Sequence, residues 1–545
     1  MDLPINRREF VKKGILSGTA GMLAWRIPFS LAAGATRSDW TSKVPKFTFG
    51  DTLAEQEKQL KGNPLMKRFA ESRKKLADDP YRPTYHFVNP ESTLNDPNGL
   101  CFWQGRWHLF YQAYPPEDPR QHWGHAVSDD LIHWRDLPYA IYPNPEHKCF
   151  SGSTYVEKDR VIAMYHGTEV GNMVAISRDP LLLNWKKVAG KAVIPIRSSD
   201  GSPMPYRIHD PCIWRKDGVY YSLSNGRDWY RELEYLFRSD DLEHWEYMHP
   251  FIENDRFTFK GDDGACPYFW PIGDRHILLF YSHMSGGQYF LGDYDTQRDK
   301  FVVTSHGKFN FGPSWSAGVH APSATPDGKG GVIAIFNMNP GKPTKGWNQI
   351  MTLPRRLTLL SDEQLGIELA GDVKSLRYQH QRAASQQLPA NEEVVLDAIR
   401  GNAMELEAEI DLCNAPMIEM NVLRSPDRQE YTRIAFFPNR GYRRPDYRGR
   451  HSSFISLESS RSSLLANVVS RAPETAEILL DEKESLKLRV FVDKSVVEVF
   501  ANGKQCLAVR VYPGRKDSLG VSLRSQGRDA MLKSLDAWQM KNIYI

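Results

Sequence analysis

The chain has few cysteines and lacks the short motifs that mark several large classes of enzyme. Its 545 residues include six cysteines, Cys101, Cys149, Cys212, Cys266, Cys413 and Cys506, with no Cys-x-x-Cys pair and no metal-binding spacing. A glycine-rich phosphate loop, a Gly-x-Ser-x-Gly elbow and a His-Glu-x-x-His helix are also missing. We therefore expect no disulfide framework, no redox or nucleotide cofactor and no metal ion.

The chain also lacks a strong net charge and a long apolar run. Its formal net charge is +4, and residues 1–35 hold five Lys and Arg against two Asp and Glu, so the remainder is nearly neutral. A nucleic-acid partner is not expected from such a balance. The apolar run Gly14–Trp25 is about 12 residues long, which is too short for a membrane-spanning helix.

The N-terminus resembles a twin-arginine export signal. Arg7 and Arg8 precede the apolar run, and a stretch of small residues ends at Ala35. We expect residues 1–35 to be this signal and the mature protein to be periplasmic or extracellular. The alternative is an N-terminal anchor that is not cleaved.

A short helical segment precedes the main body of the chain. Within residues 36–84, apolar residues between positions 51 and 79 are interspersed with Lys and Glu, as in amphipathic helices. Gly62-Asn63-Pro64 should divide this segment into two helices.

Five units of one pattern follow between residues 94 and 340. Each unit begins with a turn, often Asp-Pro or Ser-Gly, and continues with an apolar strand, a short charged or glycine turn and a second apolar strand. The hairpin turns fall near Gly105, Lys158, Lys216, Gly273 and Gly328, at spacings of 53 to 58 residues. A strand repeat of this length predicts a five-bladed β-propeller over residues 85–365, in which the opening turns converge on one pocket.

The pattern changes after the fifth unit. Residues 366–393 are polar and are expected to form a linker, and residues 394–545 show short alternating strands with polar turns. Asn502-Gly503 between two alternating runs predicts a hairpin. The sequence therefore predicts an all-β protein, a five-bladed propeller followed by a C-terminal β-sandwich.

Several motifs, taken in order, resemble those of glycoside hydrolase family 32, which includes invertases, levanases and inulinases. They are Leu94-Asn95-Asp96-Pro97-Asn98-Gly99, Leu109-Phe110-Tyr111-Gln112, Trp123-Gly124-His125, Asp130-Leu131-Ile132-His133-Trp134, Phe150-Ser151-Gly152-Ser153, Leu353-Pro354-Arg355-Arg356-Leu357 and the run 491–502. The resemblance extends from about Tyr85 to the C-terminus. It implies a retaining glycosidase that acts on furanosides.

The resemblance assigns roles to two acidic residues. Asp96 matches the family nucleophile, and Asp210 matches the carboxylate that stabilises the transition state. Two positions depart from the family pattern, because His209 replaces the Arg before the stabiliser and Ala265 replaces the acid/base Glu before Cys266-Pro267. Alanine cannot donate a proton, and such assistance is typically worth about 10²–10⁴-fold in rate.

Three explanations for Ala265 remain open at the level of sequence. Asp263 lies two residues earlier, so on a strand it would face the same side as Ala265 and could act as the acid. His209 or His320 could supply the proton instead, because imidazole titrates in the required range. Otherwise each of these two histidines would bind a sugar hydroxyl of the substrate or form a hydrogen bond in the core. Alternatively, the propeller has lost catalysis and only binds sugar.

The remaining candidate residues suit a carbohydrate ligand. By the resemblance, Asn95, Gln112, Trp123, Phe150 and Ser151 would contact a furanoside, although Trp123 and Phe150 could equally be core residues. We expect hydrolysis of a furanosidic bond, most simply β-fructofuranosidic, in an oligo- or polysaccharide. The alternatives are a glycan-binding propeller without activity and a glycosidase for another sugar. The sandwich is expected to assemble homodimers or to shape the pocket rim.

Overall fold

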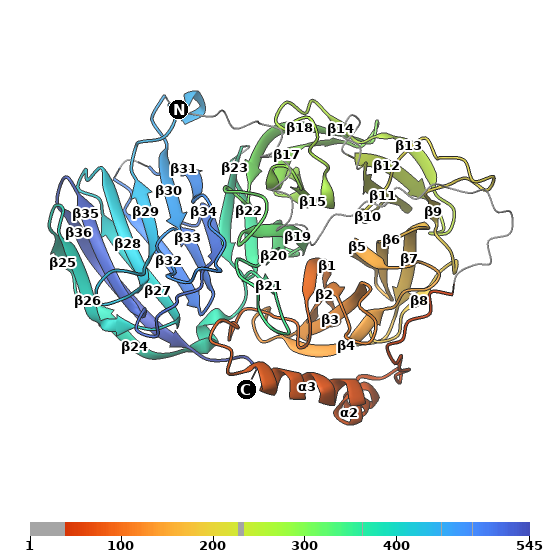
Figure 1. The fold of residues 1–545 in the computed structure, drawn as a ribbon. Helices are drawn as coiled ribbons and strands as arrows, with labels where there is room; N and C mark the ends of the chain where they lie inside the picture. Colours follow the sequence, from red (N-terminus) through yellow and green to blue (C-terminus); the bar gives the residue numbers. More distant parts are fainter. Residues whose placement is uncertain (1–38, 227–233, 362, 448, 482, 545) are drawn as a thin grey trace, which may run out of the picture. The chain divides into compact units, whose positions relative to one another are not determined.

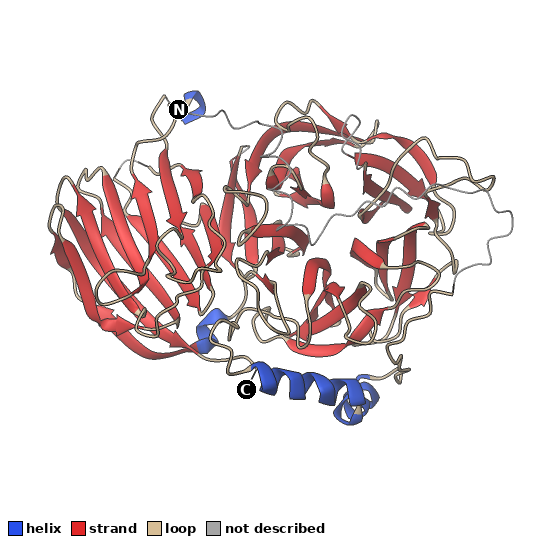
Figure 2. Cartoon of the chain, viewed as in Figure 1, coloured by secondary structure: helices blue, strands red, loops and turns tan. Residues whose placement is uncertain are grey.

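The computed structural model describes residues 39–226, 234–361, 363–447, 449–481 and 483–544. Every element below belongs to one unit, Trp40–Ile545. The predicted export signal, residues 1–35, lies outside the described residues. Strands dominate the described chain, with two α-helices at the edge of the propeller (Figure 2).

Five mainly antiparallel sheets follow one another around a ring and form the blades of the propeller (Figure 1). The first blade contains β1 (Leu94–Trp103), β2 (Arg106–Ala113), β3 (His122–Ser128) and β4 (Arg135–Ile141). The second contains β5 (Cys149–Val156), β6 (Val161–Gly167), β7 (Gly171–Ser177), β8 (Lys186–Lys187) and β9 (Ile194–Pro195). The third contains β10 (Pro211–Lys216), β11 (Val219–Asn225), β12 (Glu234–Ser239) and β13 (Glu246–Pro250). The fourth contains β14 (Ile252–Glu253), β15 (Ala265–Ile272), β16 (Arg275–Ser282), β17 (Gly286–Asp295) and β18 (Lys300–Lys308). The fifth contains β19 (Val319–Pro326), β20 (Val332–Met338), β21 (Ile350–Met351), β22 (Arg355–Ser361) and β23 (Gln364–Leu369). The predicted five-bladed repeat is confirmed, and each predicted hairpin turn lies between the first two strands of its blade.

The hydroxyl group of Tyr268 in β15 ties the inner strands together. It accepts a hydrogen bond from the backbone N–H of Gly99 at 3.0 Å and lies 2.9 Å from the carbonyl oxygen of Gly152. It also lies 2.8 Å from the hydroxyl of Ser323. Four of the five inner strands therefore meet at one buried side chain, which fixes the positions of the strand ends that open into the pocket.

The N-terminal segment forms the two expected helices, α2 (Leu53–Gly62) and α3 (Pro64–Leu76). Thr52 and Glu55 form a capping box at the start of α2. Asn63 accepts hydrogen bonds from the first turn of α3, and Pro64 occupies the first helical position, where its missing N–H costs nothing. Phe69 of α3 packs edge-on against Tyr139 of β4, so the helix covers the first blade.

Two sheets of the C-terminal domain pack as a sandwich. One contains β24 (Arg377–Ala383), β25 (Gln386–Leu388), β27 (Ala403–Asp411), β32 (Leu486–Asp493), β33 (Val496–Ala501), β34 (Gln505–Arg510) and β36 (Ala530–Met540). The other contains β26 (Glu393–Arg400), β28 (Met417–Arg424), β29 (Thr432–Phe437), β30 (Ser453–Glu458), β31 (Glu474–Ile478) and β35 (Gly520–Gln526). Aliphatic side chains from both sheets form the core, and the predicted Asn502-Gly503 turn joins β33 to β34.

Residues 366–393 are more ordered than the expected linker. The end of β23 completes the fifth blade, a 3₁₀ turn follows at Val373–Leu376, and β24 and β25 both pair with β36. The partner strand lies about 150 residues further along the chain, so these pairings leave no local pattern that a sequence analysis could detect.

A fully buried charged cluster joins the propeller to the sandwich. His86 Nδ1 lies 2.9 Å from Asp493 Oδ2, and His86 Nε2 lies 3.1 Å from Glu498 Oε1. Arg355 of β22 donates to the other oxygen of Glu498 at 3.1 Å. We call these four residues the junction cluster. None of their side chains is exposed, so each charge depends on the others for solvation.

Candidate active site

The pocket ends of the inner strands are irregular, and the irregularities hold the candidate residues. The strand pairing shifts between Leu94 and Pro97, Cys149 and Gly152, Ala265 and Tyr268, and Val319 and Pro322. In a regular strand, successive side chains point to opposite faces of the sheet. A bulge interrupts this alternation and changes the direction in which a side chain points. Asp96, Ser151, Cys266 and His320 lie within these four bulges, while Asp210 directly precedes β10.

Asp96 is buried and contacts the polar side chains of three neighbouring residues. Its Oδ2 accepts hydrogen bonds from the hydroxyl of Ser151 at 2.7 Å and the amide of Gln112 at 3.1 Å. Its Oδ1 lies 3.2 Å from His320 Nδ1. Burial by itself raises the pKa of a carboxyl, but the contacts with His320 and Ser151 outweigh it and hold the pKa of Asp96 below its ordinary value. Asp96 is therefore ionised near neutral pH.

Asp210 approaches Asp96 across a shared thiol. The Cys266 sulfur lies 3.6 Å from the Oδ2 atoms of both carboxylates, which are therefore no more than twice that distance apart. The backbone N–H of Cys266 donates to Asp210 Oδ2 at 3.2 Å. Cys266 has a positive φ of 53°, an uncommon conformation for a side chain with a Cβ, and this turns both its N–H and its thiol toward the acidic pair.

The pKa values of the two carboxyl groups are shifted in opposite directions. Burial and the charge of Asp96 raise the pKa of Asp210 to about 6. Burial and both carboxylates raise the pKa of the Cys266 thiol well above its ordinary range, so the sulfur remains a neutral donor. Neighbouring carboxyl groups whose pKa values are driven apart are typical of a site for acid–base or nucleophilic chemistry.

A network of side-chain amides surrounds Asp96. The Asn95 carbonyl accepts from Gln349 at 3.0 Å and from Asn337 at 3.3 Å, and its amide donates to Gln112 at 3.3 Å. Gln112 also donates to Ser151 at 2.7 Å. The structure thus brings Asn95, Gln112 and Ser151 together around Asp96, in positions where their remaining polar groups suit sugar hydroxyls.

The two aromatic candidates differ in their exposure. Trp123 is fully buried, its indole N–H donates to the carbonyl of Phe150 at 2.9 Å, and it packs against Phe110 and Tyr165. This is the core-packing alternative that the sequence left open for Trp123. Phe150 is only partly buried and lies beside His166, so its ring remains accessible.

The candidate histidines lie on different sides of the acidic pair. His320 Nδ1 contacts Asp96 and also lies 3.3 Å from the side-chain oxygen of Asn337, so both contacts engage the same ring nitrogen. His209, beside Asp210 in the chain, packs its ring 4.6 Å from that of His166, and its backbone bonds to the end of β11. His209 therefore belongs to the wall formed by the second and third blades.

Asp263 is held by a residue that the sequence analysis did not single out. Its Oδ1 accepts from the backbone N–H of His283 at 2.9 Å, and its Oδ2 lies 2.7 Å from His283 Nδ1. Ala265 is buried and pairs with Tyr281, two residues before His283. In the sequence, His283 is visible only as a histidine that follows the apolar strand 275–282. Nothing in that pattern indicates that it contacts Asp263.

Glu234 is a second residue that the sequence analysis missed. It begins β12, is 1% exposed, and neither carboxyl oxygen has a hydrogen-bond partner among the described residues. Burial, with the charges of Asp210 and Asp263, raises the pKa of Glu234 well above its ordinary value. A buried carboxyl group whose protonated form is favoured thus lies near Asp210 and Asp263.

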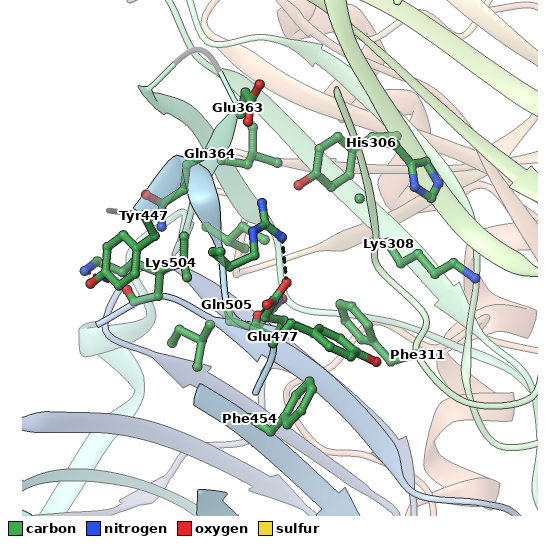
Figure 3. A pocket seen from close by; sticks show the side chains of 18 of the residues that line it. His306, Lys308, Phe311, Glu363, Gln364, Tyr447, Phe454, Glu477, Lys504 and Gln505 are labelled. Carbon is green, nitrogen blue, oxygen red and sulfur yellow. Dashed lines mark hydrogen bonds and ion pairs between the residues drawn. The ribbon is translucent and has the colours of Figure 1, made fainter. Parts of the chain in front are cut away.

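A separate pocket lies between the propeller and the sandwich (Figure 3). It has a volume of about 1060 Å³ and is lined by residues such as His306, Lys308, Phe311, Tyr447, Phe454 and Lys504. Its Glu477 carboxylate accepts from Arg444 at 2.9 Å, as the dashed line in Figure 3 shows. Glu477 is thus paired with a guanidinium, whereas Asp96 contacts a histidine, a hydroxyl group and an amide.

Other kinds of site are not found in the part of the chain that the structure describes. No three His, Cys, Asp or Glu side chains are grouped there in a way that could hold a metal ion. All six cysteines are free. No described helix is long and apolar enough to cross a membrane.

Comparison with known proteins agrees with this architecture. The chain matches the models of the glycosyl hydrolases family 32 N-terminal domain over residues 86–368 and the family 32 C-terminal domain over residues 372–539. It is 28% identical over 516 residues to a levanase of Bacillus subtilis, with 86% of this chain and 71% of the levanase covered. It is 26% identical over 551 residues to a fructan 6-exohydrolase of Beta vulgaris, with 86% and 88% covered.

A solved structure gives the same result for the fold. The crystal structure of fructan 1-exohydrolase IIa from Cichorium intybus superposes with a TM-score of 0.74 at 23% identity, covering 85% of this chain and 98% of that one. The two family models span the propeller and the sandwich in the expected order and match far more than half of the residues. The chain therefore belongs to glycosyl hydrolase family 32.

Proposed function

We propose that the protein is a glycosidase that hydrolyses β-fructofuranosidic bonds in an oligo- or polysaccharide. The observation that carries this proposal is the meeting of Asp96 and Asp210 at the Cys266 thiol, with their pKa values driven in opposite directions. Relatives described as levanase, fructan 6-exohydrolase and sucrose-6-phosphate hydrolase support a fructose-containing substrate.

In this mechanism Asp96 attacks the anomeric carbon. Hydrogen bonds from Ser151 and Gln112 keep it ionised and fix its orientation, so little reorganisation is needed at the moment of reaction. Asp210 would face the sugar ring as positive charge develops there, because it lies on the other side of the shared thiol. A covalent intermediate on Asp96 implies overall retention of configuration.

Substitution of Asp96 tests the proposal. Purified protein and the Asp96→Ala and Asp96→Asn variants would be incubated with sucrose, inulin, levan and an aryl fructofuranoside. We expect release of fructose by the unchanged protein and its loss, by at least about 10³-fold, in both variants. Asp129→Asn is the matched control, because Asp129 is an exposed carboxylate in a blade turn.

The stereochemistry of the product gives an independent check. NMR of the first-formed anomer should show retention, because two displacements occur at the anomeric carbon. Inversion would exclude Asp96 as the nucleophile and would indicate direct attack by water.

A glycan-binding propeller without turnover is the second candidate, and Ala265 is the observation that favours it. With no carboxyl group at that position, the protein could bind sugar without protonating a leaving group. Saturable binding of a fructan without turnover, unchanged in Asp96→Asn, would support this candidate over the glycosidase.

Export through the twin-arginine pathway to the periplasm or the outside of the cell is also part of the proposal. It is supported by Arg7, Arg8 and the short apolar run that follows them. Residues 1–35 fused to a reporter should direct its export, and the Arg7→Lys, Arg8→Lys double variant should retain the reporter inside the cell.

A homodimer formed through the sandwich domain remains a prediction from the sequence. Light scattering on the purified protein would measure its mass in solution, and a mass of one chain at micromolar concentration would contradict the dimer.

A further inference from the structure

The proposed reaction needs a proton donor that Ala265 cannot supply. The donor must carry a proton near neutral pH, face both Asp96 and Asp210, and be accessible to the leaving oxygen. The inference below rests on the proposed function and concerns which residue meets these conditions.

His283 lies beside the position of Ala265. Ala265 pairs with Tyr281 across β15 and β16, and residues two apart on a strand point to the same side. Asp263 precedes Ala265 by two residues and His283 follows Tyr281 by two, so the two residues meet just beyond the paired strands. The imidazole of His283 thus lies next to the position at which Ala265 lacks a carboxyl group.

His283 also faces the acidic pair. Its ring centre lies 6.2 Å from that of His320, whose Nδ1 contacts Asp96. Its imidazole is close enough to both carboxyl groups to contribute to lowering the pKa of Asp96 and to oppose the rise in the pKa of Asp210. Its side chain is 31% exposed, so a ligand can reach it.

Asp263 gives this histidine a defined protonation. Because Asp263 binds Nδ1, the ring nitrogen that can exchange a proton with a substrate is Nε2. A carboxylate at this distance orients the ring and stabilises the imidazolium form, as in hydrolases that use a His–Asp pair.

The same two-point contact occurs elsewhere for a different purpose. His133 binds Asp130 and His244 binds Asp241 through both the backbone N–H and Nδ1, but these residues are three apart within single exposed turns. Asp263 and His283 are 20 residues apart and join two strand ends of the fourth blade at the pocket. The contact there holds a side chain at the site and does more than close a turn.

An exposed tryptophan lies next to His283 and offers a contact face for the leaving group. Trp315 is 48% exposed, and its ring centre lies 5.6 Å from that of His283 and 6.4 Å from that of His320. A flat apolar face suits the ring of a sugar. The leaving sugar would therefore stack at Trp315 with its glycosidic oxygen near His283.

We propose that His283, oriented by Asp263, is the general acid and base of this enzyme. In the first step the Nε2 proton moves to the glycosidic oxygen as its bond to the anomeric carbon breaks and Asp96 bonds to that carbon. In the second step neutral His283 takes a proton from water as the water oxygen bonds to the anomeric carbon and Asp96 leaves. The proton returns to Nε2, so one water molecule is consumed and the enzyme is restored.

Glu234 is a rival donor among the described residues, because burial, together with Asp210 and Asp263, raises its pKa. Its carboxyl oxygens have no exposed surface, whereas a general acid must come within about 2.6–3.2 Å of the atom it protonates. The structure therefore favours His283, and the experiment includes Glu234→Gln as a direct comparison.

Two substrates with different leaving groups test the proposal. Sucrose needs protonation of its leaving oxygen, whereas an aryl fructofuranoside with a nitrophenolate leaving group does not. For His283→Gln we expect kcat/KM on sucrose to fall by about 10²–10⁴-fold and on the aryl substrate by less than about 10-fold. Azide should restore turnover of the aryl substrate and give a fructosyl azide of retained configuration, because azide needs no general base. His244→Gln, in an exposed turn, is the matched control and should behave as the unchanged protein.

The positioning role of Asp263 has its own measurement. Asp263→Asn should move the alkaline limb of the pH profile of kcat/KM on sucrose to lower pH, because the imidazolium loses its carboxylate partner. Equal losses on both substrates without azide rescue in His283→Gln, or the leaving-group pattern in Glu234→Gln instead, would overturn the assignment. Absence of turnover by the unchanged protein on either substrate would instead refute the proposed function, and with it any reaction for His283 to assist.

Discussion

Raising the pH should lower the free energy of unfolding, because His86 of the junction cluster loses its proton. Burial lowers the pKa of a histidine, but the hydrogen bonds to Asp493 and Glu498 outweigh it and raise the pKa of His86 from 6.5 to about 9. A group whose pKa is raised by folding stabilises the folded state fully below its unfolded pKa. That stabilisation is lost as the pH rises through the folded value. The window is therefore from about pH 6.5 to about pH 9.

The size of the effect follows from the shift. A change of one pKa unit corresponds to 1.36 kcal/mol, so this shift represents about 3 kcal/mol of free energy of unfolding. With an unfolding entropy of about 2.1 cal/mol/K for each of roughly 500 residues, about 3 kcal/mol lowers Tm by about 3 °C. The carboxylates of the cluster stay ionised throughout, because their pKa values are lowered by His86 and, for Glu498, by Arg355.

Thermal unfolding followed by circular dichroism between about pH 6 and pH 9.5 measures this loss. In His86→Gln the dependence on pH should flatten, and Tm at pH 6 should fall, because breaking a buried ion pair costs about 3–5 kcal/mol. His306→Gln is the control, since burial lowers the pKa of His306 to about 4, outside the window. An unchanged slope in His86→Gln would show that the junction cluster does not titrate as described.

Three further predictions concern the pocket. The rate kcat/KM should fall as the pH drops through about 6, because protonation removes the charge of Asp210, and Asp210→Asn should abolish this limb. Ser151→Ala should lower kcat on sucrose by about 10-fold, because Asp96 loses a 2.7 Å hydrogen bond that fixes its orientation; an unchanged kcat would contradict this role of Ser151. Gly152→Ala should lower Tm, because its Cβ would lie 2.1 Å from the carbonyl oxygen of Met164 and force β5 and β6 apart; equal Tm values would contradict the close approach.

The sequence was a good guide where the signals are local. Hairpin turns at positions such as Gly105 and Gly273 depend on a few adjacent residues, so the five blades could be counted from the repeat. The two helices were equally accessible, because Asn63 and Pro64 are themselves the end of one and the start of the next. The family resemblance placed Asp96 and Asp210 at the pocket ends of two blades, and the structure brings them together.

The sequence was a poor guide where contacts join distant residues. The pairing of Asp263 with His283 depends on which residue lies opposite which beyond the ends of β15 and β16, and the bulge at Ala265 shifts that register. The burial of Glu234 depends on the third and fourth blades closing around it. Neither fact leaves a pattern within a short window of residues.

The bulges at the inner strand ends have a consequence for how such a pocket can change. Beyond each shift the pairing is regular, as between Tyr268 and Leu279, so the frame of the blade does not depend on which side chain the irregular turn displays. A position there can lose its acidic group without unsettling the sheet, and a neighbour on the adjoining strand can take over the vacated task. The stability of the ring thus does not depend on the identity of its reactive groups, and the proposed role of His283 beside Ala265 would be one such exchange.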